Sequence, residues 1–235
     1  MRSARLWRKL ARVSHDGGKP NVGPGPAQCV VSQAGPRRKR LSLISRGFRR
    51  GRLDEPARIP SGQYVTAGFP VLSTGPTPHP PLDHWRFAIR GAVDAPVSWT
   101  WEELLALPAE TPTVDIHYVT KWSKLDTSWK GVSADTVLEG VETKARYLSG
   151  WRDAGYTTNL PVVDVTGGKA WIAYEYDGEA LQPGHGGPAR LLVPHLSLGK
   201  SAKWGRGLEL LEHDKPGFWE GYGYHNYGDP WREQR

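Results

Sequence analysis

Two short basic motifs in the second half of the chain have the residue types needed to bind a buried phosphate. The first motif, HGGPAR at 185–190, ends in Arg190, and the second motif, GKSAKW at 199–204, contains Lys200 and Lys203. A phosphate removed from water needs fixed cations and backbone N–H donors, because an unpaired buried charge is costly. The glycines of both motifs let the backbone approach such a ligand closely. Each cation alone is typical of a solvated surface, but together they indicate a ligand site.

Four segments carry the residues that relate this chain to a known family. They are VDIHYVTKWSKLDTSWKGV at 114–132, GYTTNLPVVDV at 155–165, AYEYDGEALQPGHGGPARLLVP at 173–194 and GKSAKW at 199–204. Their order and spacing resemble the molybdopterin-binding domain of the sulfite-oxidase family, particularly its small prokaryotic oxidoreductases. The resemblance runs from about residue 43 to the last residue given. It implies molybdopterin, the molybdenum cofactor, as the cofactor, and oxygen-atom transfer as the reaction.

The resemblance also implies which residues contact the cofactor and the substrate. Tyr174, in AYEYDGE, matches a tyrosine that lines the substrate pocket of the sulfite oxidases, where a phenol assists proton movement. A strand tyrosine that only packs its ring is the alternative. The stretch from Thr66 to Leu72 matches a weaker contact segment. The cofactor-contacting positions implied by the family are Thr157 or Thr158 toward the pterin, His185, Arg190, Ser201, Ala202 and Lys203.

Tyr118 is the main departure from the family pattern. Relatives place a Cys there, and its thiolate binds molybdenum as a soft ligand. A phenol is a harder ligand with an unperturbed pKa of about 10, and its oxygen lies several bonds farther from the backbone. We therefore expect Tyr118 to face the metal, either as an unusual ligand or as a block. Lys121 and Lys124 occupy the region where sulfite oxidases have a substrate-binding arginine, which suggests a different substrate.

Charge divides the chain into two parts. Residues 1–52 contain 14 Lys and Arg and one acidic residue, whereas residues 53–235 contain 17 Lys and Arg and 23 acidic residues. The first part is rich in Gly, Pro and Arg without apolar periodicity, and we predict a disordered N-terminal extension there. Nucleic-acid binding through the GPRRKR run at 35–40 is the alternative. Residues 53–235 are predicted to form one molybdopterin-binding oxidoreductase domain.

The composition also restricts location and partners. A single cysteine, Cys29, excludes an intramolecular disulfide, and no apolar run is long enough to span a bilayer. No secretory signal pattern is evident. We expect a cytoplasmic protein that does not bind a membrane and acts on a small-molecule substrate, with nucleic acid disfavoured as a partner. Electrons would pass to a separate partner, because no haem- or flavin-binding segment is evident.

The periodicity predicts an α+β protein that is mainly β, with mixed sheets and short helices. Thr100 and Glu103 form a capping-box pattern that opens a short helix through Leu107, and Ser133 caps a second helix through about Glu139. Six strands are expected, at 85–90, 114–119, 145–148, 171–176, 189–193 and 208–211. The aromatic segment 218–231 is predicted to be a packed cover over one sheet, with a recognition surface as the alternative.

Two functions remain open from the sequence. The first is an oxidoreductase that transfers an oxygen atom to or from a small oxyanion or a sulfoxide-like substrate. The second is a cofactor-binding module that no longer turns over, a pseudoenzyme, because Tyr118 replaces the ligand cysteine.

Overall fold

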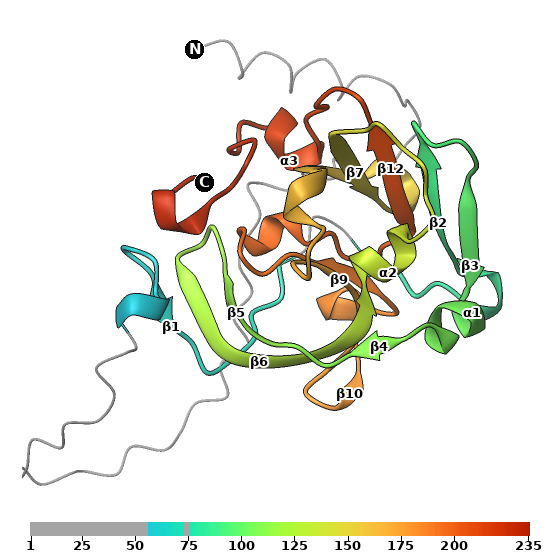
Figure 1. The fold of residues 1–235 in the computed structure, drawn as a ribbon. Helices are drawn as coiled ribbons and strands as arrows, with labels where there is room; N and C mark the ends of the chain where they lie inside the picture. Colours follow the sequence, from blue (N-terminus) through green and yellow to red (C-terminus); the bar gives the residue numbers. More distant parts are fainter. Residues whose placement is uncertain (1–55, 73–75) are drawn as a thin grey trace, which may run out of the picture.

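Two β-sheets connected by short helices form the protein, as the sequence predicts. The coordinates are a computed structural model that describes residues 56–72 and 76–235. Figure 1 shows one sheet around the long strand β6 at the lower left and the other at the upper right, where β2, β3, β7 and β12 lie. The extension predicted at residues 1–52 lies outside the described residues.

The first sheet is organised by β6, the longest strand. Strand order is β1-β6-β9-β10, with β4 and β5 also paired to β6 and β11 paired to β9. Its strands are β1 (Tyr64–Val65), β4 (Ala109–Glu110), β5 (Thr113–His117), β6 (Trp122–Ser133), β9 (Trp171–Tyr176), β10 (Glu179–Ala180) and β11 (Arg190–Leu192). Only β1 runs parallel to β6 among these pairs. The sheet therefore joins two of the four family-like segments, 114–132 and 173–194.

The second sheet has the order β3-β2-β12-β7-β8. Its strands are β2 (Arg86–Gly91), β3 (Val97–Thr100), β7 (Tyr147–Trp151), β8 (Thr157–Pro161) and β12 (Gly207–Leu211). β12 is parallel to β2 and antiparallel to β7. Gly207 lies opposite Ala88 where β12 pairs with β2. A Cβ at Gly207 would stand 2.1 Å from the carbonyl oxygen of Ala88, so only glycine permits the two strands to lie this close.

Helices are few and short. In α1 (Trp101–Ala106), Thr100 accepts a hydrogen bond from the Glu103 N–H while the Glu103 carboxylate accepts one from the Thr100 N–H, which confirms the predicted capping box. Ser133 caps α2 (Ala134–Leu138) as predicted. The remaining helices are α3 (Phe218–Gly221) and the 3-10 turns η2 (Pro56–Arg58), η3 (Leu82–His84), η4 (Asp153–Gly155), η5 (Val162–Asp164), η6 (Pro183–His185), η7 (Leu198–Lys200) and η8 (Pro230–Arg232). Within the described residues, no helix is long and apolar enough to cross a bilayer.

The apolar interior has two parts. The larger core packs side chains of both sheets with α1 and α2, and includes Trp85, Phe87 and Leu148. The smaller core lies against β6 and includes Trp122 and Trp129. Burying each such aromatic ring contributes roughly 2–3 kcal/mol of transfer free energy. The smaller core is the one that reaches the candidate site.

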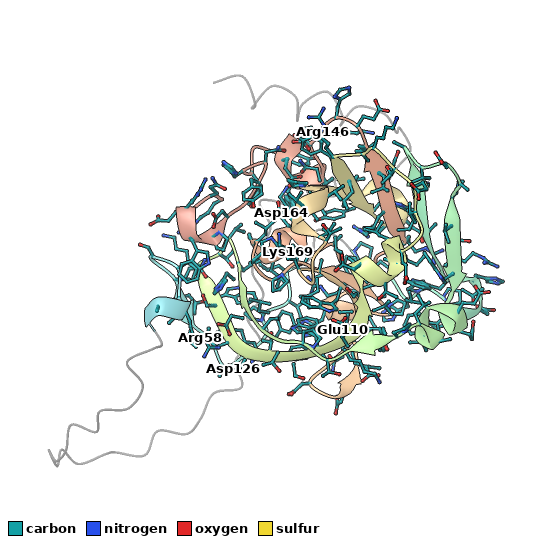
Figure 2. The ribbon with its side chains drawn as sticks, viewed as in Figure 1. Arg58, Glu110, Asp126, Arg146, Asp164 and Lys169 are labelled. Carbon is teal, nitrogen blue, oxygen red and sulfur yellow. The ribbon has the colours of Figure 1, made fainter. Side chains whose placement is uncertain are left out.

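An ion-pair cluster connects the 3-10 turn η2 to strands β5 and β6 of the first sheet. Arg58, in η2, donates to Asp115 on β5 at 2.5 and 2.8 Å and to Asp126 on β6 at 2.7 Å. Figure 2 shows Arg58 and Asp126 close together at the outer edge of β6. These side chains are partly exposed, so the cluster contributes little net stability and serves mainly to position η2.

Candidate cofactor site

A cavity of about 190 Å³ lies where five stretches of chain meet. They are the turn between β5 and β6, the connection between β7 and β8, the start of β11, the segment 197–204 that contains the GKSAKW motif, and the C-terminal segment that contains α3. Phe69 and Leu72, from the predicted weaker contact segment, close another side. The polar and charged residues that line the cavity, tryptophans apart, are Tyr118, Thr120, Arg152, Tyr156, Arg190, Ser197, Lys200, Ser201, Lys203, Glu220, Tyr224, His225, Gln234 and Arg235. The cations outnumber the single carboxylate, so the cavity suits an anionic ligand.

Tyr118 lies in the tight turn that connects β5 to β6. Its N–H donates to the carbonyl oxygen of Trp122, its own carbonyl accepts from the Lys121 N–H, and Lys121 has a left-handed φ of 70°. The predicted strand 114–119 therefore ends earlier, at His117, because the chain reverses there. The Tyr118 ring packs on the Trp122 ring with centroids 5.4 Å apart. The turn thus places Tyr118 at the cavity wall, half-buried.

Arg190 is the buried cation of the cavity. Its side chain is 1% exposed, and its Nη1 and Nη2 donate to the carbonyl oxygens of His185 at 2.9 Å and Ser201 at 2.8 Å. Burial lowers the pKa of Arg190 to about 10, and the phenols of Tyr118 and Tyr156 oppose this shift. Its Nε is buried without a hydrogen-bond partner among the described residues. Two neutral carbonyls leave the positive charge uncompensated, which favours a bound anion.

Lys203 joins the two basic motifs. Its Nζ donates to the carbonyl oxygens of Leu72 at 2.9 Å and Gly184 at 2.7 Å. Burial, assisted by Arg190, lowers the pKa of Lys203 to about 7. Gly186 packs on Lys203 with φ of 107°, and a Cβ at Gly186 would lie 2.9 Å from the Lys203 Cβ. Only glycine there allows the HGGPAR turn to reach GKSAKW.

Lys200 has a different role from the one its sequence motif suggests. It is 3% exposed and forms a buried ion pair with Glu220 of α3, and it donates to the Asn159 side-chain oxygen at 2.9 Å. Burial lowers the pKa of Lys200, and the Glu220 pair opposes that shift. Lys200 therefore fastens the C-terminal segment over the cavity. This partner was not predicted, because Glu220 lies in the aromatic segment 218–231, which was interpreted as a packed cover with a recognition surface as the alternative.

Four further residues implied by the family lie around the cavity without lining it. The His185 ring stacks on Phe69 with centroids 4.0 Å apart, and burial lowers the pKa of His185 to about 4, so the ring is neutral. Thr158 is buried and Ala202 belongs to the larger core, whereas Thr157 is half-buried at the start of β8. Ser201 does line the cavity, and its hydroxyl accepts from the Val193 N–H at 2.9 Å.

The structure does not bring Tyr174 to this cavity. Its side chain is 6% exposed on β9 and belongs to the larger core, where its ring makes an edge contact with Trp101 at 6.1 Å. β9 alternates its side chains between the two faces of the sheet, and Tyr174 faces away from the smaller core. A place for Tyr174 on the substrate side thus has no support in this geometry, and strand packing describes it better.

Tyr156 and Trp204 are cavity residues that the sequence did not single out. The Tyr156 hydroxyl donates to the carbonyl oxygen of Gly199 at 3.3 Å, and burial raises the pKa of Tyr156. The Trp204 indole N–H donates to the carbonyl oxygen of Pro183 at 2.8 Å. Both belonged to quoted motifs, but only the folded chain shows that they point at one cavity.

The donors around the cavity fit a phosphorylated, hydrogen-bonding cofactor. Arg190 Nε, His185 Nδ1, Thr158 Oγ1 and Ser197 Oγ are buried polar atoms without hydrogen-bond partners among the described residues. Such atoms are rare in native folds and indicate a missing partner. Among the described residues, no group of three or more His, Cys, Asp or Glu gathers to hold a metal, so a metal here would depend mainly on its cofactor. The cavity and its unpartnered polar atoms are those of a domain that binds an anionic cofactor.

Comparison with known proteins identifies the family. The model of the oxidoreductase molybdopterin-binding domain matches residues 74–219. The chain is 43% identical over 185 residues to the uncharacterized oxidoreductase YuiH of Bacillus subtilis, a match that covers 77% of this chain and 93% of that protein. The chain belongs to the oxidoreductase molybdopterin-binding domain family, as the sequence resemblance implied, and molybdopterin is its cofactor.

More distant relatives are longer proteins. A putative protein-methionine-sulfoxide reductase subunit, YedZ1, of Azospira oryzae is 27% identical over 61% of this chain and 55% of its own length. A nitrate reductase of Phaseolus vulgaris is 28% identical over 57% of this chain and 19% of its own length. The sulfane dehydrogenase SoxCD of Paracoccus pantotrophus shares the fold, with a TM-score of 0.53 and 23% identity over 59% of this chain and 41% of that chain.

Proposed function

We propose that this protein is a molybdenum-cofactor oxidoreductase that transfers an oxygen atom to or from a small oxyanion or a sulfoxide-like substrate. The single observation that carries the proposal is the cavity that joins Tyr118 to Arg190, Ser201 and Lys203. When bound, the cofactor supplies a metal that changes oxidation state by two electrons as the oxygen atom moves. The residues of the chain bind and orient the cofactor and exclude water.

Each polar group has a role in this proposal. Arg190 and Lys203 would neutralise the phosphate of the bound cofactor, because both cations line the cavity. Phe69 and Trp122 make one side of the cavity apolar, which strengthens electrostatic interactions inside it. Tyr118, which lines the cavity, would face the metal of the bound cofactor. Two electrons then leave to, or arrive from, a separate protein partner in the cytoplasm, a proposal in keeping with the subunit named in Azospira.

A second function is favoured by one observation. Tyr118 packs on Trp122 at the position where relatives have the ligand cysteine, and a phenol is a poorer match for molybdenum than a thiolate. The protein would then bind the cofactor without turning over a substrate. Both functions require the cofactor, and they differ only in the chemistry at Tyr118.

The test measures cofactor content before any substrate is chosen. The full chain is expressed in a host that makes the molybdenum cofactor, and molybdenum is measured by mass spectrometry and pterin by fluorescence after oxidation. We expect about one of each per chain, and at least a tenfold loss in Arg190→Gln. Arg90→Gln, which removes a partly exposed cation on β2, is the matched control. Wild-type protein without molybdenum and pterin would refute the proposal.

A further inference from the structure

The outer part of the cavity contains a guanidinium that has no hydrogen-bond or ion-pair partner among the described residues. Arg152 follows β7, is half-buried, and lies over the rings of Trp204 at 4.7 Å and Tyr156 at 5.3 Å. Within residues 56–72 and 76–235, its side chain makes no hydrogen bond or ion pair. Two cation–π contacts fix its position and leave its donors available.

The other cations of the cavity are already engaged. Arg190 and Lys203 donate to backbone carbonyls, Lys200 pairs with a buried carboxylate, and Arg235 lies 3.9 Å from Glu233. Arg190, Lys200 and Ser201 are nearly inaccessible to solvent, so they line the deep end, whereas Arg152 lies nearer the solvent. The deep end suits a resident cofactor, and the outer end suits a ligand that enters and leaves.

The chemistry of the guanidinium indicates which ligands Arg152 can bind. Its N–H groups form a planar fork that matches two oxygens of an oxyanion, and the two ring contacts involve the π-faces of Trp204 and Tyr156 rather than a hydrogen-bond acceptor. Trp204 and Tyr156 also exclude water from one face, which strengthens a charge-assisted hydrogen bond. A neutral sulfoxide offers one oxygen and no charge, so it would gain much less from this fork.

The two lysines that follow Tyr118 in the sequence, Lys121 in the turn and Lys124 on β6, do not supply an alternative cation for binding the substrate. Neither Lys121 nor Lys124 lines the cavity, and Lys124 donates to the carbonyl oxygen of Ala67 at 2.7 Å. The positive charge that sulfite oxidases place in that region is therefore turned away from the cavity here. Arg152 reaches the cavity from the opposite sheet.

We infer that Arg152 binds the substrate at the mouth of the cavity and selects an oxyanion over a neutral sulfoxide. The inference rests on the proposed function, because it names the substrate class of the same site. Arg152 orients the anion by a bidentate contact while the deep cations hold the cofactor. No electron or proton moves at Arg152 in this assignment.

The experiment measures the binding of sulfate, used as an inert oxyanion probe, to cofactor-loaded full-length protein. Isothermal titration at constant ionic strength compares wild type, Arg152→Gln, Arg152→Lys and Arg146→Gln. Arg146 is an exposed arginine that precedes the same strand, β7, and is labelled in Figure 2, so its variant removes one charge outside the cavity. We expect at least a tenfold weaker sulfate affinity in Arg152→Gln, about 1.4 kcal/mol. Arg152→Lys should lose part of the affinity and Arg146→Gln none, with equal molybdenum and pterin in all four proteins.

Several outcomes would overturn the inference. They are absent sulfate binding in wild type, an unchanged affinity in Arg152→Gln, an equal loss in Arg146→Gln, or tighter binding of dimethyl sulfoxide than of sulfate. Loss of pterin from Arg152→Gln would assign Arg152 to the cofactor instead. The proposed function and this inference can fail separately. Wild-type protein without molybdenum and pterin would contradict the proposed function. Full cofactor content, with sulfate binding that does not depend on Arg152, would contradict only the inference.

Discussion

Arg190 Nη2 donates to the carbonyl oxygen of Ser201 at 2.8 Å, and this bond joins the end of the HGGPAR motif to the middle of the GKSAKW motif. The bond uses the backbone of Ser201, so it depends on the path of the chain and not on the serine side chain. Backbone carbonyls compensate the Arg190 charge only partly, and the remainder is available to an anion. The motifs therefore form one site, in which a cation is positioned in advance of its ligand.

Tyr118→Cys is expected to restore a thiolate ligand. The turn that holds residue 118 depends on backbone hydrogen bonds, so the variant should keep the fold and the cofactor content. X-ray absorption at the molybdenum edge should show one more sulfur neighbour than in wild type. Turnover that appears only in Tyr118→Cys would establish the natural chain as a pseudoenzyme, whereas an unchanged sulfur count would show that residue 118 does not reach the metal.

Lys200→Met should destabilise the protein by about 3–5 kcal/mol, because it leaves the Glu220 carboxylate buried without its cation. The double variant Lys200→Met/Glu220→Leu should recover much of that loss, since it removes both charges. Urea denaturation measures both effects, and limited proteolysis follows the release of the C-terminal segment. A single variant as stable as wild type would contradict the assignment of this ion pair.

Lys203 makes stability depend on pH. Burial lowers its folded pKa to about 7, and an unfolded lysine titrates at about 10.4, so the unfolded chain binds more protons between these values. The free energy of unfolding of the cofactor-free protein should therefore rise with pH from 7 to 10, relative to Lys203→Met, by at most about 1.4 kcal/mol per pH unit. Below pH 7 the difference should be constant. Urea denaturation at each pH gives this comparison, and a difference that stays level from pH 7 to 10 would contradict it.

Tyr174→Phe is expected to have little effect on the site. The residue packs in the larger core and does not line the cavity, so removing its hydroxyl should leave molybdenum and pterin content unchanged and stability within about 1 kcal/mol. Turnover with an artificial electron acceptor gives the decisive measurement. A loss of tenfold or more would restore the catalytic role that the family resemblance implied.

Local patterns predicted the elements that depend on local chemistry. The capping box at Thr100, the cap at Ser133 and the strand Trp171–Tyr176 were all predicted correctly, because cap hydrogen bonds and apolar runs depend on adjacent residues. β6 was not predicted as a strand. Its polar residues, the left-handed φ of 54° at Asp126 and a bulge before Gly131 obscure its periodicity.

The sequence was sufficient to predict which cations belong to the site, but not how the site residues are arranged in space. Arg190 and Lys203 stand in recognisable motifs, and the structure places both at one cavity. The pairing of Lys200 with Glu220 and the stacking of Arg152 on Trp204 depend on how the two sheets meet, and no local pattern records that. Tyr174 lies outside this cavity, so the substrate-side role that the family motif implies stays a prediction, which the Tyr174→Phe variant tests.

The hydrogen bond from Lys203 to Leu72 spans 131 residues of sequence. Contacts of such long sequence separation slow folding, because the chain must close a long loop before the contact gives any stabilisation. This side of the cavity therefore exists only when two segments far apart in the sequence have come together. We expect cofactor binding to require the folded domain, because neither segment alone forms the site.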